Sequence, residues 1–199
     1  MTLLTIAAGL AKNVGIAVPS QVVLSALREW VEAVQMANES GEELARRVDW
    51  GVLRATTTLT GTGAEATFAL PAAFARISPG GAVRFGTAIV RPLTRAEWIG
   101  LVPIVGTPRY FLLEGSNITL WPFMANAATA TVSYQSKNWA SAGETFLADD
   151  NTSLIDEDLL LKGLIVRWRR QKGMDYADNE AEYEAALQQF ARFDDRSRI

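Results

Sequence analysis

The chain has 199 residues, 49% of them hydrophobic, and its 19 basic and 22 acidic residues give a formal net charge of -3. It has no histidine and no cysteine, which excludes Ser–His and Cys–His nucleophile pairs, disulfides and the usual zinc sites. The acidic balance argues against a protein whose main task is to bind nucleic acid over a broad surface. We expect one core with an insertion, no cofactor and no metal.

Residues 1–49 are predicted to be helical. Residues 1–15 favour a short amphipathic helix capped by Thr2, because no basic region precedes the apolar residues as it would in a targeting signal. After a loop at 15–20, we expect a long helix over 21–48. An apolar stripe along such a helix packs against the protein's own core or lines a subunit interface, and core is the commoner case. Its apolar or small positions alternate by four and three residues: Val23, Leu27, Trp30, Val34, Ala37, Gly41, Leu44 and Val48.

Residues 50–140 change to threonine, valine and glycine in short alternating patterns, which are typical of strands. One short helix is expected over 71–76, because proline suits a first helical turn. Thr94 and Glu97 form a capping box that opens another. The segment predicts one small antiparallel sheet, with strands at 53–59, 66–70, 82–90 and 129–136 and a hairpin of 110–113 against 118–121.

Residues 141–199 predict a helix hairpin and a tail. Ser153 and Asp156 resemble a capping box, and Gly173 suits a left-handed cap at the end of the first helix. Acids open this helix and cations close it, which compensates the helix dipole: Asp156, Glu157 and Asp158, then Arg167, Arg169, Arg170 and Lys172. The second helix carries Tyr176, Tyr183 and Phe190 at intervals of seven.

The fold class predicted from these elements is α+β. The N-terminal and C-terminal helix pairs (1–49 and 141–199) form a helical bundle, and 50–140 is an inserted β-rich subdomain. No apolar stretch approaches the roughly 20 residues that span a bilayer, so we expect no membrane contact.

The cations of the C-terminal hairpin are the first candidate for a binding site. With Trp168 among them they resemble a nucleic-acid patch, but dipole compensation accounts for most of them. A phosphate or acidic-partner contact stays open for one or two. Arg46 and Arg47 repeat the arrangement at the end of the long helix, and two basic helix ends that converged would form a positive rim.

Catalytic or metal-binding groups are few. The Thr60–Gly63 segment lacks the Gly-Lys-Ser/Thr ending of a phosphate loop and is predicted to be a turn. Glu144, Asp149 and Asp150 are the clustered carboxylates outside helix starts, and a glycan hydrolase would need two of them facing each other at roughly 5–10 Å. The acids from Asp149 to Asp158 lack the spacing of a calcium loop. We expect the protein not to be an enzyme.

The sequences of several segments resemble those of the head-to-tail adaptor proteins of tailed bacteriophages, also called tail accessory or head-completion factors. The resemblance covers most of the chain, and its motifs are structural rather than catalytic. The matching segments are 43–50 (ELARRVDW), 68–76 (FALPAAFAR), 132–139 (VSYQSKNW), 154–160 (LIDEDLL) and 168–173 (WRRQKG).

The resemblance implies a structural connector of the virion, assembled in the host bacterial cytoplasm. Identical subunits, twelve in number, would form a ring below the portal protein. The ring would extend the DNA channel, contact the genomic DNA transiently, and seat the next tail protein (nozzle, tail tube or tail completion protein).

Two groups of residues are candidates for these contacts. Arg46 and Arg47 are candidates for the channel or its rim. Within the polar tail 191–199, Phe193 and Ile199 offer two apolar anchors that could order on binding. The candidates for portal or subunit contact are Asp156, Glu157, Asp158, Arg167, Trp168, Arg169, Arg170, Lys172, Phe193 and Ile199. The alternative function is a nucleic-acid-binding module that uses residues 167–172.

Overall fold

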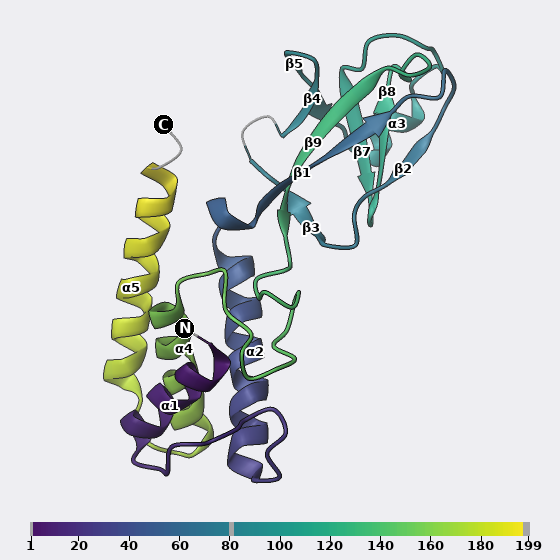
Figure 1. The fold of residues 1–199 in the computed structure, drawn as a ribbon. Coiled ribbons are helices and arrows are strands. Elements are labelled where there is room, and N and C mark those ends of the chain that lie inside the picture. Colours follow the sequence, from purple (N-terminus) through teal and green to yellow (C-terminus); the bar gives the residue numbers. More distant parts are fainter. Residues whose placement is uncertain (1, 80–81, 197–199) are drawn as a thin grey trace. The chain divides into compact units, whose positions relative to one another are not determined.

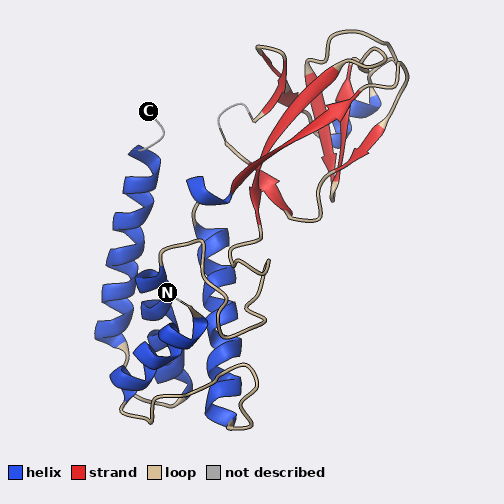
Figure 2. Ribbon diagram, in the orientation of Figure 1, coloured by secondary structure: helices blue, strands red, loops and turns tan. Residues whose placement is uncertain are grey.

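The computed structural model describes residues 2–79 and 82–196. The chain divides into two compact units (Figure 1). The helical unit contains Met1–Leu53 and Lys137–Ile199, and the β unit contains Arg54–Ser136. All the long helices lie in the first unit and the strands lie in the second (Figure 2). The chain therefore has a mixed α+β fold.

Four helices and a short 3-10 turn are described in the helical unit. They are α1 (Leu3–Val14), α2 (Arg28–Arg47), η1 (Gly51–Leu53), α4 (Glu157–Gln171) and α5 (Ala177–Arg196). α4 packs against each of the other three helices. The predicted cap of α1 is confirmed, because the Thr2 side chain accepts a hydrogen bond from the Thr5 amide at 3.3 Å.

The long helix is shorter than predicted, because α2 begins at Arg28 rather than near residue 21. The preceding residues form turns that a side chain from elsewhere in the chain holds in place. Asp149 accepts hydrogen bonds from the backbone amides of Val22 at 3.0 Å and Val23 at 2.8 Å. These amides donate to a carboxylate that is more than 120 residues away in the sequence. The helical periodicity does not reveal such a long-range contact.

The two ends of α4 compare differently with the prediction. Asp156 is itself the N-cap, accepting from the Leu159 amide at 3.0 Å, so the capping box with Ser153 is wrong. The predicted left-handed glycine is confirmed: Gly173 has φ +66°. Its amide bonds to Arg170 O at 3.2 Å, and the next amide, of Met174, bonds to Arg169 O at 2.9 Å. This pair of bonds is a Schellman motif.

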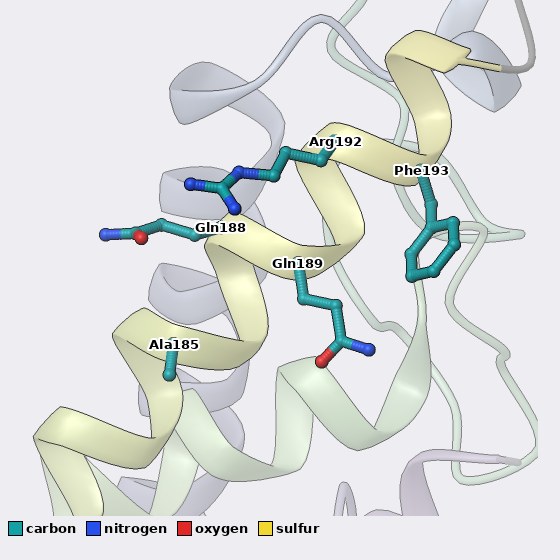
Figure 3. Close-up of a pocket in the computed structure, with 5 residues that line it drawn as sticks. All are labelled: Ala185, Gln188, Gln189, Arg192 and Phe193. Carbon is teal, nitrogen blue, oxygen red and sulfur yellow. The ribbon is translucent and has the colours of Figure 1, made fainter.

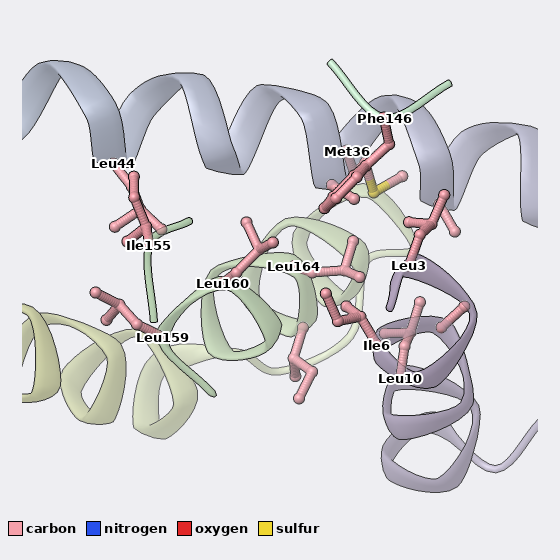
Figure 4. Close-up of a cluster of buried hydrophobic side chains, with 14 of the residues drawn as sticks. Leu3, Ile6, Leu10, Met36, Leu44, Phe146, Ile155, Leu159, Leu160 and Leu164 are labelled. Atoms are coloured by element: carbon pink, nitrogen blue, oxygen red, sulfur yellow. The ribbon is translucent and has the colours of Figure 1, made fainter. Parts of the chain in front are cut away.

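The core of the helical unit is built around α4 (Figure 4). Its leucines at 159, 160 and 164 are fully buried. They lie in one cluster with apolar side chains of α1 and α2, among them Leu3, Ile6, Leu10 and Leu44. Burial on most sides explains why the sequence of α4 is apolar almost all round.

Gly41 makes a close approach possible inside this core. A Cβ atom at Gly41 would lie 2.4 Å from the indole ring of Trp139, which is fully buried. Gly41 therefore admits a large aromatic side chain from the segment that follows the β unit.

The β unit contains two sheets, larger than the one small sheet that the sequence predicts. The first has the order β1 (Arg54–Thr60), β9 (Thr129–Ser136), β4 (Val83–Phe85), β5 (Ala88–Ile89), and β3 (Phe74–Ile77) also pairs with β9. The second has the order β2 (Thr67–Ala69), β8 (Asn117–Trp121), β7 (Tyr110–Glu114), β6 (Arg91–Pro92). β6 and β7 run parallel, so the unit is not wholly antiparallel as predicted.

Two local predictions in the β unit are wrong. Residues 71–76 do not form a helix: one turn, closed by the Phe74 amide on Pro71 O at 2.8 Å, leads directly into β3. Residues 82–90 are not one strand but the β4–β5 hairpin, which reverses at Gly86 with φ +58°. Glycine adopts this left-handed conformation without steric cost, so Gly86 permits the reversal.

Three other local predictions are confirmed. The 110–121 hairpin forms as β7 and β8, and the last strand forms as β9 over the predicted residues. The capping box opens α3 (Arg95–Ile99): the Glu97 amide donates to Thr94 Oγ1 at 3.4 Å, and the Thr94 amide donates to the Glu97 carboxylate at 2.8 Å.

Candidate functional site

The cations that end α4 are held by acids of the neighbouring helices. Arg167 lies 3.2 Å from Glu39 of α2 and also pairs with Glu43. One turn further on, Arg170 lies 2.5 Å from Glu180 of α5. The side chains that look like a basic patch in the sequence therefore connect helices of the same chain.

Two more pairs extend this pattern along α2. Lys172 lies 2.5 Å from Glu32, and Arg47 makes two hydrogen bonds of 2.6 Å to Glu184 of α5. The hydrogen bond from Lys172 lowers the pKa of Glu32, and the bond from Arg47 lowers the pKa of Glu184. We call this set the ion-pair ladder. Its members are Arg47, Arg167, Arg170 and Lys172 with Glu32, Glu39, Glu43, Glu180 and Glu184.

The remaining residues of the predicted basic patch also face their own unit. Trp168 is buried in the core, and the Lys172 Nζ atom lies 4.8 Å from the centre of its ring. Arg169 donates from Nη1 to the backbone oxygen of Asp175 at 3.0 Å. Arg170 lies over the ring of Tyr176 at 4.8 Å. An indole inside the core is not available to stack on a base.

The two basic helix ends meet at one acid of α2: Arg47 Nη1 lies 3.1 Å from the Glu43 carboxylate, and Arg167 pairs with the same carboxylate. Lys172 meets α2 near its start, at Glu32, whereas Arg46 and Arg47 lie at its end. Glu32 and Arg46 are fourteen positions apart on the helix, a distance of about 21 Å along the axis. Arg46 pairs with Glu42 on its own helix. The structure thus brings Arg47 and Arg167 to a shared acid, whereas Arg46 and Lys172 pair with acids near opposite ends of α2.

The predicted acidic residues have local structural roles. Asp156 caps α4, Glu157 is its first residue, and the Asp158 carboxylate lies 3.6 Å from Lys162. Asp149 binds the two valine amides described above, so it is not merely a solvated loop residue. Glu144 lies 3.1 Å from Lys137. Among the residues that the structure describes, no group of three or more acids is arranged to hold a metal ion.

One of the two predicted C-terminal anchor residues, Phe193, lies on α5. The helix extends to Arg196, so most of the predicted free tail is helical. Phe193 is 60% exposed and lines an open pocket of about 360 Å³ together with Gln188, Gln189 and Arg192 (Figure 3). The Asp194 carboxylate accepts a hydrogen bond from the Gly51 amide at 2.8 Å. Ile199 lies outside the described residues.

Three arginines of the β unit were not among the site residues predicted from the sequence. Arg54, Arg91 and Arg109 of the β unit are exposed and make no side-chain hydrogen bond or ion pair with any described residue. The net charge of each predicted segment, taken separately, would have indicated them. The charge of the whole chain conceals them, because the helical segments are acidic.

The charged side chains of the ion-pair ladder join helices of one unit to one another, and five of them line a pocket of only about 90 Å³. A family model described as SU10 adaptor protein matches residues 1–199, the whole chain. The chain belongs to this family: it is an adaptor-type structural protein of a bacteriophage, a component of the virion that interacts with other head or tail proteins. No curated protein matches the chain. Within the described residues, no helix is both long and apolar enough to cross a membrane.

Proposed function

We propose that the protein is the head-to-tail connector of a tailed phage. Identical copies, twelve in number, form a ring below the portal protein, extend the DNA channel, and seat the next tail protein. The observation that carries this proposal is the match of the adaptor family model over the entire chain. The ring would assemble in the host cytoplasm and stay at the head–tail junction of the virion.

In this proposal the helices of 1–49 and 141–199 form one bundle that serves as the rigid body of the subunit. Residues 50–140 are an inserted subdomain that supplies a second surface. Interhelical ion pairs and the α4 core support this division, because both hold together segments from the two ends of the sequence. A ring needs two different faces on each subunit, and a chain of two units can place one face on each.

The nucleic-acid alternative is less well supported. It depends on residues 167–172, of which Arg167, Arg170 and Lys172 are paired with acids of α2 and α5. Arg169 donates to a backbone oxygen, and Trp168 is buried in the core. Binding DNA phosphates through the paired cations would require those ion pairs to break. If DNA binding through this helix end were the main function, affinity would fall with salt with a slope near -0.9 per phosphate contact.

Electron microscopy of the purified protein, with and without the portal protein of its phage, tests the proposal. We expect mostly monomers at micromolar concentration for the protein alone, and rings at one end of each portal when the two are mixed. The portal would act as a template, because each bound subunit makes the next contact effectively intramolecular. No association with the portal at any ratio would overturn the connector function. Stable rings without the portal would overturn the template role.

A further inference from the structure

The two units of the chain carry opposite net charges. Of the 19 basic residues six lie in the β unit, and of the 22 acidic residues three do, which gives this unit a formal charge of +3. The remaining 13 basic and 19 acidic residues give the helical unit -6. The overall value of -3 thus hides a strong asymmetry within each molecule.

Some exposed, unpaired charges in each unit have the sign of that unit's net charge. Eight cations of the helical unit form ion pairs within it, whereas Arg91 and Arg109 of the β unit are exposed and pair with no described residue. These two arginines lie on neighbouring segments, because the Arg91 amide donates to Arg109 O at 2.9 Å. On α5, the exposed acids Asp178 and Glu182 likewise have no partner among the described residues and lie one turn apart.

Arg91 also borders an apolar groove of about 490 Å³ in the β unit. Its wall continues into the core of this unit and includes two exposed side chains, Ile89 at 53% and Leu113 at 37%. A phosphate backbone has no apolar group to fill such a groove, whereas a protein surface does. The groove and the arginines together therefore fit a protein partner better than DNA.

We propose that the occupant is a second copy of this chain. The Arg91–Arg109 surface, with its groove, contacts the acidic face of α5 around Asp178 and Glu182 on the next subunit. Charge complementarity selects this occupant, because the molecule itself carries the opposite charge on its other unit. Such a contact joins two different faces, the kind that closes a ring. The inference rests on the proposed connector function and specifies its subunit interface.

Charge reversal on the portal tests this interface. The double variant R91E/R109E is compared with wild type by counting portals that carry a ring in electron micrographs. We expect at least a tenfold loss, and a smaller loss in the same direction for R91A/R109A. Melting of each isolated variant checks that it folds, which we expect because both arginines are exposed. The matched control is K12E/R54E, which changes the net charge equally on exposed residues that pair with no described residue, and it should assemble as wild type does.

Reversal of the acids completes the test. Adding D178R/E182R to R91E/R109E should restore rings, whereas D178R/E182R alone should lose them. Wild-type rings should weaken between about 50 and 500 mM salt, because exposed charges are screened over this range. Normal rings from R91E/R109E would overturn the inference, whether or not that variant lost affinity for duplex DNA. Failure of the compensating reversal to restore rings would overturn it as well. Wild type that forms no ring on the portal would instead refute the connector function.

Discussion

At the scale of single residues, the helical unit depends on matching small residues with large ones. Gly41 admits Trp139, and a Cβ at Gly163 would lie 2.3 Å from Ser40 Oγ, so α2 and α4 also pack closely at that point. Protein interiors at this density tolerate neither a gap nor an added methyl group without cost. Two substitutions test the two directions.

Leu164→Ala should lower the free energy of unfolding by about 2–5 kcal/mol, because it leaves a cavity in a helix surrounded by protein. Leu164 is fully buried. Urea unfolding followed by circular dichroism measures the change. The control is Leu24→Ala, since Leu24 is 84% exposed and its change should stay within about 0.5 kcal/mol. A loss below about 1 kcal/mol for Leu164→Ala would place α4 at the periphery.

Gly41→Ala should destabilise by about 1–3 kcal/mol, because the new methyl group would overlap a buried, rigid indole. Helix propensity alone predicts the opposite sign, since alanine favours a helix over glycine by roughly 1 kcal/mol. Gly9→Ala in α1 separates the two effects. Its methyl group would meet the end of the flexible Leu161 side chain at 2.8 Å, so this variant should be neutral or more stable. Equal responses of the two variants in urea unfolding would contradict the packing argument.

At the scale of elements, predictions made from local sequence motifs are correct where neighbouring residues determine the structure. The capping box of α3, the 110–121 hairpin and Gly173 all depend on residues within one or two turns of each other. The failures have long-range causes. β9 is paired by three strands at once, so 74–77 forms a strand although Pro71 favours a helix start.

The candidate site was predicted with the right residue types but not with their partners. Acid and base at the ends of α4 satisfy its dipole, as predicted, yet their pairing with α2 and α5 decides what they can bind. Glu39 and Arg167 are 128 residues apart in the sequence. No periodicity within one helix reveals such a pair, so the ion-pair ladder required the structure.

The two aromatic residues near the end of α5 should separate binding from stability. Phe193 is mostly exposed, whereas Phe190 packs against the helical core. Phe193→Ala should leave the melting temperature unchanged and weaken attachment to the portal, measured by co-sedimentation. Phe190→Ala should cost roughly 2 kcal/mol of stability, because it removes a partly buried ring. Full portal attachment by Phe193→Ala would show that the anchor lies elsewhere.

At the scale of the whole molecule, the helical unit is discontinuous in sequence. The chain leaves it after Leu53 and returns at Lys137. At this crossing Arg54 and Gln135 are direct partners in the β1–β9 pair, and antiparallel partners lie about 5 Å apart. The two ends of the helical unit therefore meet the β unit at neighbouring residues.

Replacing residues 54–136 with about four glycine and serine residues should leave the helical unit folded. Such a linker reaches about 13 Å when extended, more than the gap requires. Far-UV circular dichroism should show a helical spectrum, and urea unfolding should be cooperative. The same linker inserted at residue 163, inside α4, is the control and should abolish folding. An unfolded 54–136 replacement would show that the helical unit depends on the β unit.

The position of this crossing also bears on how the family can diversify. Since both strands at the boundary belong to one antiparallel pair, mutation can lengthen, shorten or exchange everything beyond them while the path of the helices stays the same. Selection on the helical unit and selection on the β unit can then proceed separately, with different partners driving each. We expect relatives of this adaptor to vary most in length and sequence between positions 54 and 136.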